Sequence, residues 1–177
     1  MLSGSLQPLA LHAGMGAGFA AILEAEGIRR EQDGDNFGKY LKVIGKTCQS
    51  AIAIPAIFRI CDLISQAAMK VFPFVGSTAA RVLTYSNSIV FSSVAVLSPL
   101  VFEAIRGRYE GRSLSLIEKA DLEKINFYDK LISYSVKVIN LTHLIAMAII
   151  SGFSMPLALG VGLSVLTVLP VLIEQLS

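Results

Sequence analysis

The chain has 177 residues and a formal net charge of +2, and 54% of its residues are hydrophobic. Only 16% of the residues are charged, against about 25% in ordinary soluble proteins. This composition excludes disorder as a description of the whole chain. So small a basic excess cannot neutralise a run of phosphates, and we expect no nucleic-acid partner. Two cysteines are too few for a disulfide scaffold.

The first part of the chain changes character at Glu24. Residues 1–23 carry no charge, but glycine and proline interrupt them, and they lack the basic start of a secretory signal. From Glu24 to Asn36 the sequence is polar and contains glycine, which is typical of a solvated loop. We therefore expect an N-terminal segment and polar linker at 1–46, followed by a helical membrane domain at 47–177.

The first candidate span covers residues 47–70. Its apolar pattern is interrupted by Arg59 and Asp62, which are spaced to pair on one helix face. A lone charge at the membrane centre costs about 2.5–3.5 kcal/mol on insertion scales. Two interpretations stay open: a span with a paired polar site, or an amphipathic helix lying on the membrane surface.

The second candidate span is clearer. Pro73 and Gly76 predict a break. The next stretch, 82–102, has 21 uncharged residues, and about 20 are needed to cross a bilayer.

A charged segment follows at 103–137, with seven basic and six acidic residues. Ser115 and Glu118 have the spacing of a capping box at a helix start. Apolar residues then recur near helical spacing, as at Ile125 and Ile132. We expect an amphipathic helix here, with an interaction surface for a protein partner.

The run from 138 to 173 contains 36 residues with no formal charge, His143 being the one titratable group. A single helix of this length would measure about 54 Å, well beyond a hydrocarbon core of about 30 Å. Gly152 and Pro156 are suited to end one helix and begin another. The sequence therefore predicts a hairpin with arms at about 133–151 and 156–174.

Together these segments predict an all-α fold of two apolar helical hairpins, with about four membrane-associated helices, joined by the charged amphipathic helix. Basic residues gather before the first span, as at Arg30, and after the second, as at Arg112. Basic flanks favour the cytosolic side. We expect a multi-pass membrane protein with Arg30 and Arg112 on one side and both termini cytosolic.

No sequence motif predicts chemistry. Gly45-Lys46-Thr47 resembles the end of a phosphate-binding loop, but Tyr40 stands where that loop needs glycine. Two histidines and two cysteines in no familiar spacing predict no metal site. We expect no catalytic residues, no cofactor and no enzymatic activity.

Four residues are candidates for polar contacts inside the membrane, where a titratable or strongly polar group is a functional question by default. They are Arg59, Asp62, Asn140 and His143. The small-residue spacings Gly14-x-x-x-Gly18, Ala148-x-x-x-Gly152 and Gly160-x-x-x-Ser164 suit close helix packing. We expect the last two to pack the arms of the 138–173 hairpin together.

The N-terminus MLSGSLQPLA and the short breaks VFPFVGST and SGFSMP between apolar helices resemble the inclusion membrane proteins of chlamydiae. The resemblance covers 47–173 and concerns hydropathy. It implies insertion in a vacuole or inclusion membrane and cytosolic parts that bind host proteins. This chain departs from the family pattern because a charged segment interrupts the hydrophobic region.

Three functions remain open. The first is a non-enzymatic membrane anchor or scaffold, with the lipid bilayer and a protein as partners and homo-oligomers as an option. The second is a soluble or peripheral all-α bundle in a larger complex, since a chain of this size cannot bury so much apolar surface alone. The third is a small transporter or channel.

Overall fold

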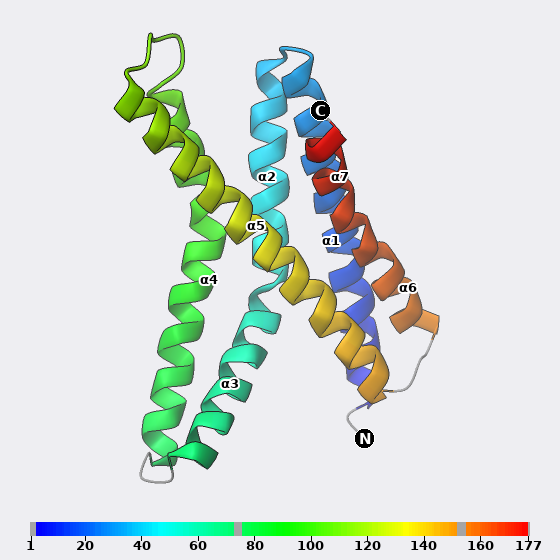
Figure 1. The fold of residues 1–177 in the computed structure, drawn as a ribbon. Helices are drawn as coiled ribbons and strands as arrows, with labels where there is room; N and C mark the ends of the chain where they lie inside the picture. Colours follow the sequence, from blue (N-terminus) through cyan, green and yellow to red (C-terminus); the bar gives the residue numbers. More distant parts are fainter. Residues whose placement is uncertain (1–2, 73–75, 152–154, 177) are drawn as a thin grey trace.

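A computed structural model describes residues 3–72, 76–151 and 155–176, and this part of the chain contains helices and no strand. The all-α fold is thereby confirmed (Figure 1). Its elements are α1 (Ser3–Gln32), α2 (Asn36–Ile52), α3 (Ile54–Val71), α4 (Ser77–Gly107), α5 (Leu116–Ser151), α6 (Met155–Val165), the 3₁₀ turn η1 (Leu166–Val168) and α7 (Leu169–Leu176).

Three of the described segments are long and apolar enough to cross a membrane, and a fourth is added if α2 and α3 form one bent span. The three are α4, residues 116–150 of α5, and residues 158–175 in α6, η1 and α7. This number agrees with the sequence prediction. The boundary drawn at residue 46, however, falls inside α2.

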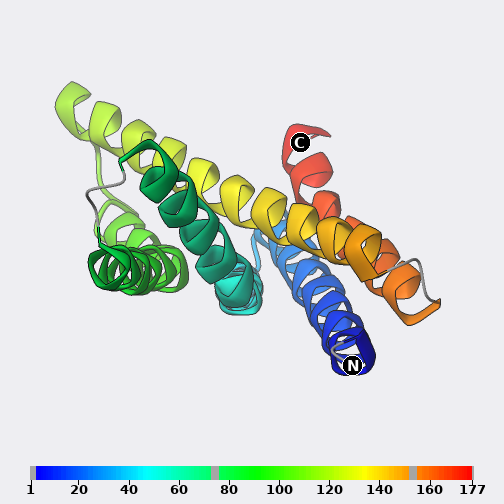
Figure 2. The same cartoon turned by 90° about the horizontal axis from the view of Figure 1, so that it is seen from below.

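The helices form two layers. Figures 1 and 2 show α4, the α2–α3 pair and α1 in one layer, while α5 crosses that layer diagonally and α6 to α7 lie beside α1. The α1–α2 turn, the α4–α5 connection and the end of α7 gather at one end of the molecule (Figure 1), which we call the polar end. The start of α1 lies at the opposite end. Cytosolic exposure of both termini stays a prediction, and it requires that α1 does not cross the membrane.

Proline stands at two places where the helices are interrupted. Pro55 stands in the first turn of α3, where the axis bends by 44° between α2 and α3. Pro170 follows the 3₁₀ turn between α6 and α7. Proline has no N–H to donate and clashes with the preceding turn, so the α-helical hydrogen bonds are interrupted at both places.

The charged segment and the first arm of the predicted hairpin are one helix. The 36 residues of α5 run without a break from Leu116 to Ser151, and residues 103–107 belong to α4. The predicted capping box is confirmed: the Ser115 backbone N–H donates to Glu118 at 2.9 Å, and the Glu118 N–H donates to Ser115 Oγ at 3.3 Å. Helix α5 ends at Ser151 and α6 begins at Met155, with Pro156 in its first turn. Gly152 lies outside the described residues.

The solvated loop expected from Glu24 to Asn36 is wrong. Residues 24–32 are the last turns of α1, and only Asp33, Gly34 and Asp35 separate α1 from α2. Gly34 has a positive φ of 81°, which glycine adopts without a steric penalty. Asp35 caps α2 by accepting a hydrogen bond from the Phe37 backbone N–H. The polar composition reflects helical ion pairs near water, which composition does not distinguish from a loop.

One such group predicts a pH response. Arg29 and Arg30 donate hydrogen bonds to the Glu26 carboxylate and lower its pKa to about 2. A lowered folded-state pKa stabilises the end of α1 above the ordinary pKa of 4.5, and this contribution is lost as the pH falls toward 2. We expect an NMR titration of the Glu26 carboxyl carbon to show a midpoint near pH 2. The midpoint should rise in Arg29→Gln, and an unchanged midpoint would contradict the assigned cause.

Close backbone contact holds α1 against α2. A Cβ added to Gly45 would lie 2.5 Å from the Glu24 backbone nitrogen, and one added to Gly38 would lie 2.5 Å from that of Glu31. Real Cβ contacts are never so short, so only glycine fits at these two positions. Small residues allow such helix approach in lipid.

The predicted packing role of Gly14-x-x-x-Gly18 is confirmed, but its partner is α6. A Cβ on Gly14 would collide with the backbone of Gly160. Gly160 thus lies against α1, while the expected contact between the two arms is made by its neighbour Val161, which packs with Ala148 of α5. Ala13 of α1 joins the same cluster. Because α1 is helical over its whole length, it supplies a small-residue surface that competes with α5.

On α4, the buried side chains are small or polar, whereas many exposed side chains are large and apolar. The buried face of α4 carries alanines, Pro99 and the hydroxyls of Thr84, Ser88, Ser92 and Ser98. Its exposed residues include Val82, Leu83, Ile89, Val90, Phe91, Val94, Leu97, Leu100 and Val101. Soluble proteins show the opposite distribution. This pattern is typical of helices that pack together in lipid through small and polar residues.

Candidate functional site

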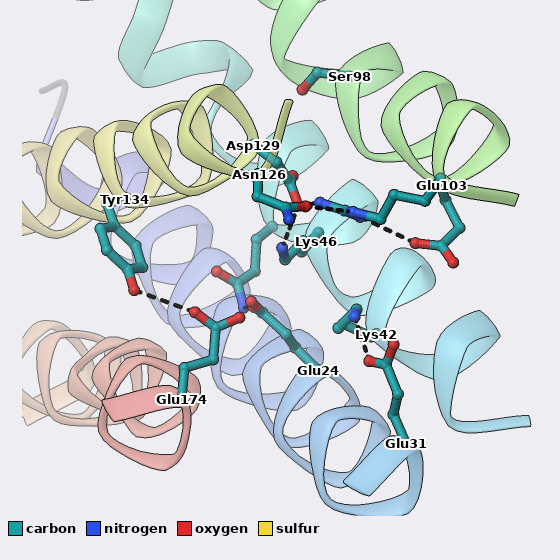
Figure 3. A network of polar contacts seen from close by, with 12 residues as sticks. Glu24, Glu31, Lys42, Lys46, Ser98, Glu103, Asn126, Asp129, Tyr134 and Glu174 are labelled. Carbon is teal, nitrogen blue, oxygen red and sulfur yellow. Dashed lines mark hydrogen bonds and ion pairs between the residues drawn. The ribbon is translucent and has the colours of Figure 1, made fainter. Parts of the chain in front are cut away.

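Four charged side chains lie deep between the helices. Glu24, Lys46, Asp129 and Lys137 have exposed fractions of 1, 6, 3 and 7%. Charged residues are almost never buried to this extent without a partner. They form two groups of ion pairs, which join helices distant in the sequence (Figure 3).

The Asp129 cluster joins α2, α4 and α5. Lys46 donates to Asp129 Oδ2 at 2.9 Å, and Arg106 donates to the same oxygen at 2.5 Å. Arg106 also donates to Asn126 at 2.9 Å and to Glu103 at 3.0 Å. The guanidinium thus uses its planar set of donors on three acceptors. The cluster fixes the position of α5 against the polar end of α4.

The Glu24 cluster joins α1, α2 and α5. Lys137 donates to one oxygen of Glu24 at 2.9 Å, and Gln49 donates to the other at 2.7 Å. The Lys137 ammonium also lies 5.7 Å from the ring centre of Tyr134. The Tyr134 hydroxyl donates to Glu174 of α7 at 3.1 Å, as Figure 3 shows. Both oxygens of the buried carboxylate are therefore satisfied.

A small cavity lies beside the clusters. It has a volume of about 10 Å³, and its lining includes Lys46, Gln49, Ser98, Asp129 and Ser133. This is room for one water molecule. The Oε1 atom of Gln49 is buried and has no hydrogen-bond partner in the described part of the chain.

The four residues proposed from sequence do not form one site. Arg59 and Asp62 of α3 approach to 4.0 Å, which agrees with the expected pairing, but their side chains are 61% and 43% exposed. Gln66 also donates to Asp62 at 2.8 Å. Asn140 is buried and His143 is half-buried on α5. Among the described residues, neither Asn140 nor His143 hydrogen-bonds to the two clusters.

The sequence pattern did not predict these clusters, because their members lie in segments that are rich in charge and were therefore expected to face water. A signal existed for Asp129, which lies on the same helix face as Ile125, Ile132 and Val136. A charge within an apolar stripe predicts a buried partner. The Gly45-Lys46 pair that resembles a phosphate loop has another use here: Gly45 allows α1 to approach, and Lys46 pairs with Asp129.

Metal ligands do not gather in the described residues: no group of three or more histidine, cysteine, aspartate or glutamate side chains there could hold an ion. Comparison of the chain with protein-family models, with curated proteins and with solved structures found no match.

Proposed function

We propose that this chain is an integral membrane protein that acts as a non-enzymatic anchor and scaffold. The observation that carries the proposal is the inverted distribution on α4, with hydroxyls inside and large apolar side chains outside. Lipid solvates such a surface, whereas water would impose a cost of about 25 cal/mol per Å² of apolar area.

A soluble bundle in a larger complex is less well supported. Large exposed apolar side chains occur on α1 to α5 and on the C-terminal helices, as at Phe19, Leu63, Phe91 and Leu172. Protein partners would have to cover nearly every side of the molecule, while a bilayer does so directly. A transporter or channel is also less well supported, since the buried charges are paired and the adjacent cavity has room for only one water molecule.

We assign the proposed scaffold role to the polar end. There Leu116 and Ile117 are 86% and 76% exposed, on the first turn of α5, beside the charged α4–α5 connection with Arg108 and Arg112. Apolar side chains among charges suit a protein interface. The resemblance to inclusion membrane proteins makes a host protein at a vacuole membrane a specific form of this proposal.

Carbonate extraction tests the membrane assignment. We expect the expressed chain to remain in the pellet at high pH, and release into the supernatant would overturn the proposal. Photocrosslinking then tests the scaffold surface, with the reactive group at Ile117 and a control at Ser77 at the other end of α4. Protein adducts at 117 alone would support the surface, whereas equal adducts at both positions would overturn it.

The topology gives a separate prediction. Arg30 belongs to the last turn of α1 and Arg112 to the α4–α5 connection, and both segments lie at the polar end (Figure 1). Basic flanks favour the cytosol. In a background without Cys48 and Cys61, single cysteines at positions 30 and 112 should react with an impermeant reagent from the same side. Labelling from opposite sides would rule out an even number of crossings between them.

A further inference from the structure

Two separate cavities lie along α5 near the C-terminal helices, and we call the line of residues that links them the seam. On α5, the seam follows Lys130, Tyr134 and Leu141, which are spaced by four and seven residues. On η1 and α7, it follows Thr167, Val171 and Glu174, which are spaced by four and three residues. These spacings keep side chains on one helix face, and the seam extends for about 16 Å along α5.

The upper part of the seam opens into a polar cavity of about 330 Å³. Two lysines and two glutamates line it: Lys42, Lys130, Glu31 and Glu174. Lys42 is paired with Glu31. Lys130 is exposed and has no partner in the described part of the chain. The cavity therefore offers positive and negative groups together.

The lower part of the seam holds an apolar cavity of about 270 Å³. Val138 and Leu141 of α5 line it, with Val168 and Val171 on the other side. Tyr134 lines this cavity, and its hydroxyl bonds Glu174 of the polar cavity. The Tyr134–Glu174 hydrogen bond therefore links the linings of the two cavities.

The depth of the seam follows from α4. The uncharged stretch 82–102 ends just before Glu103 and Arg106, and Arg106 bonds Asp129, the neighbour of Lys130. The polar cavity thus lies where the apolar length of α4 ends, at headgroup depth. Val138 and Leu141 lie about 12–16 Å further along α5, at the depth of acyl chains.

We propose that this seam binds a phospholipid with a primary amine in its headgroup, of the phosphatidylethanolamine type, an inference that rests on the proposed membrane function. The phosphate is held by Lys42 and Lys130, the ammonium by Glu31 and Glu174, and one acyl chain occupies the apolar cavity.

Charge complementarity selects this lipid class. A purely anionic headgroup would meet two carboxylates as well as two lysines. A choline headgroup carries no N–H and cannot donate hydrogen bonds to Glu31 or Glu174. A primary ammonium donates three, and such charge-assisted bonds are about twice as strong as neutral ones.

Native mass spectrometry of the full chain in detergent tests the site, with equal amounts of phosphatidylethanolamine, phosphatidylcholine and phosphatidylglycerol of matched chains. We expect binding of the ethanolamine lipid to exceed that of each other lipid by about tenfold, the equivalent of one charge-assisted hydrogen bond. Lys130→Glu should remove this preference, while Lys119→Glu, an exposed lysine of α5 away from the seam, should retain it. Leu141→Trp should reduce all lipid binding by filling the apolar cavity.

Equal binding of the three lipids, or an unchanged preference in Lys130→Glu, would overturn the proposal. Carbonate extraction of the same variants separates this failure from that of the proposed function. A chain that stays in the membrane without lipid preference contradicts only the lipid site, whereas release from the membrane contradicts the membrane assignment itself.

Discussion

Replacing Lys137 with methionine is expected to destabilise the folded protein by about 3–5 kcal/mol, the usual effect of removing one partner of a buried ion pair. Lys137 is 7% exposed and its partner Glu24 is 1% exposed. The variant leaves the Glu24 carboxylate in the interior with Gln49 as its hydrogen-bond donor among the described residues. The free energy of unfolding can be measured by SDS titration in mixed micelles, followed by circular dichroism.

Two further variants show whether the pairing is the cause. Lys124→Met, on the exposed pair with Asp121, should change the unfolding free energy by at most about 1 kcal/mol. The combination Glu24→Gln with Lys137→Met removes both charges and should recover a large part of the loss. Glu24→Gln is also measured alone. If the loss of stability in the double variant equals the sum of the losses in Glu24→Gln and Lys137→Met, the buried charges do not act as a pair.

Replacing Gly45 with leucine is expected to cost about 3 kcal/mol or more, at the upper end of overpacking effects. The new Cβ would lie 2.5 Å from the backbone nitrogen of Glu24 and 2.7 Å from the Ala20 carbonyl oxygen. Both are backbone atoms, so the conflict is relieved only if α1 and α2 separate. The next residue, Lys46, would then lose its position beside Asp129.

Gly162 provides the matched control for this substitution. It lies in helix α6, and a Cβ added there meets no atom within 4 Å. Gly162→Ala should therefore leave stability unchanged or raise it by up to about 1 kcal/mol, through higher helix propensity. The same SDS titration measures both variants. A Gly45→Leu protein as stable as Gly162→Ala would show that α1 and α2 do not need their close approach.

The sequence by itself determined the fold class and the lengths of the apolar segments. The stretch 82–102 lies in one helix, and the last two predicted arms belong to separate helices, one ending at Ser151 and the next beginning at Met155. Ser115 and Glu118 form the predicted cap. The local spacing of residues indicates where a helix begins and ends. The thickness of the bilayer sets the length that an apolar segment needs to cross it.

The identity of the buried charges was decided only by the tertiary structure. Glu24 and Lys137 are 113 positions apart, and Lys46 and Asp129 are 83 apart. Periodicity gives the face on which each residue lies, but it does not give the helix that packs there. Gly45 brings α1 against α2, and α5 then crosses both helices diagonally (Figure 1). That crossing brings residues from charged segments together as interior ion pairs, because neither lipid nor protein stabilises them singly.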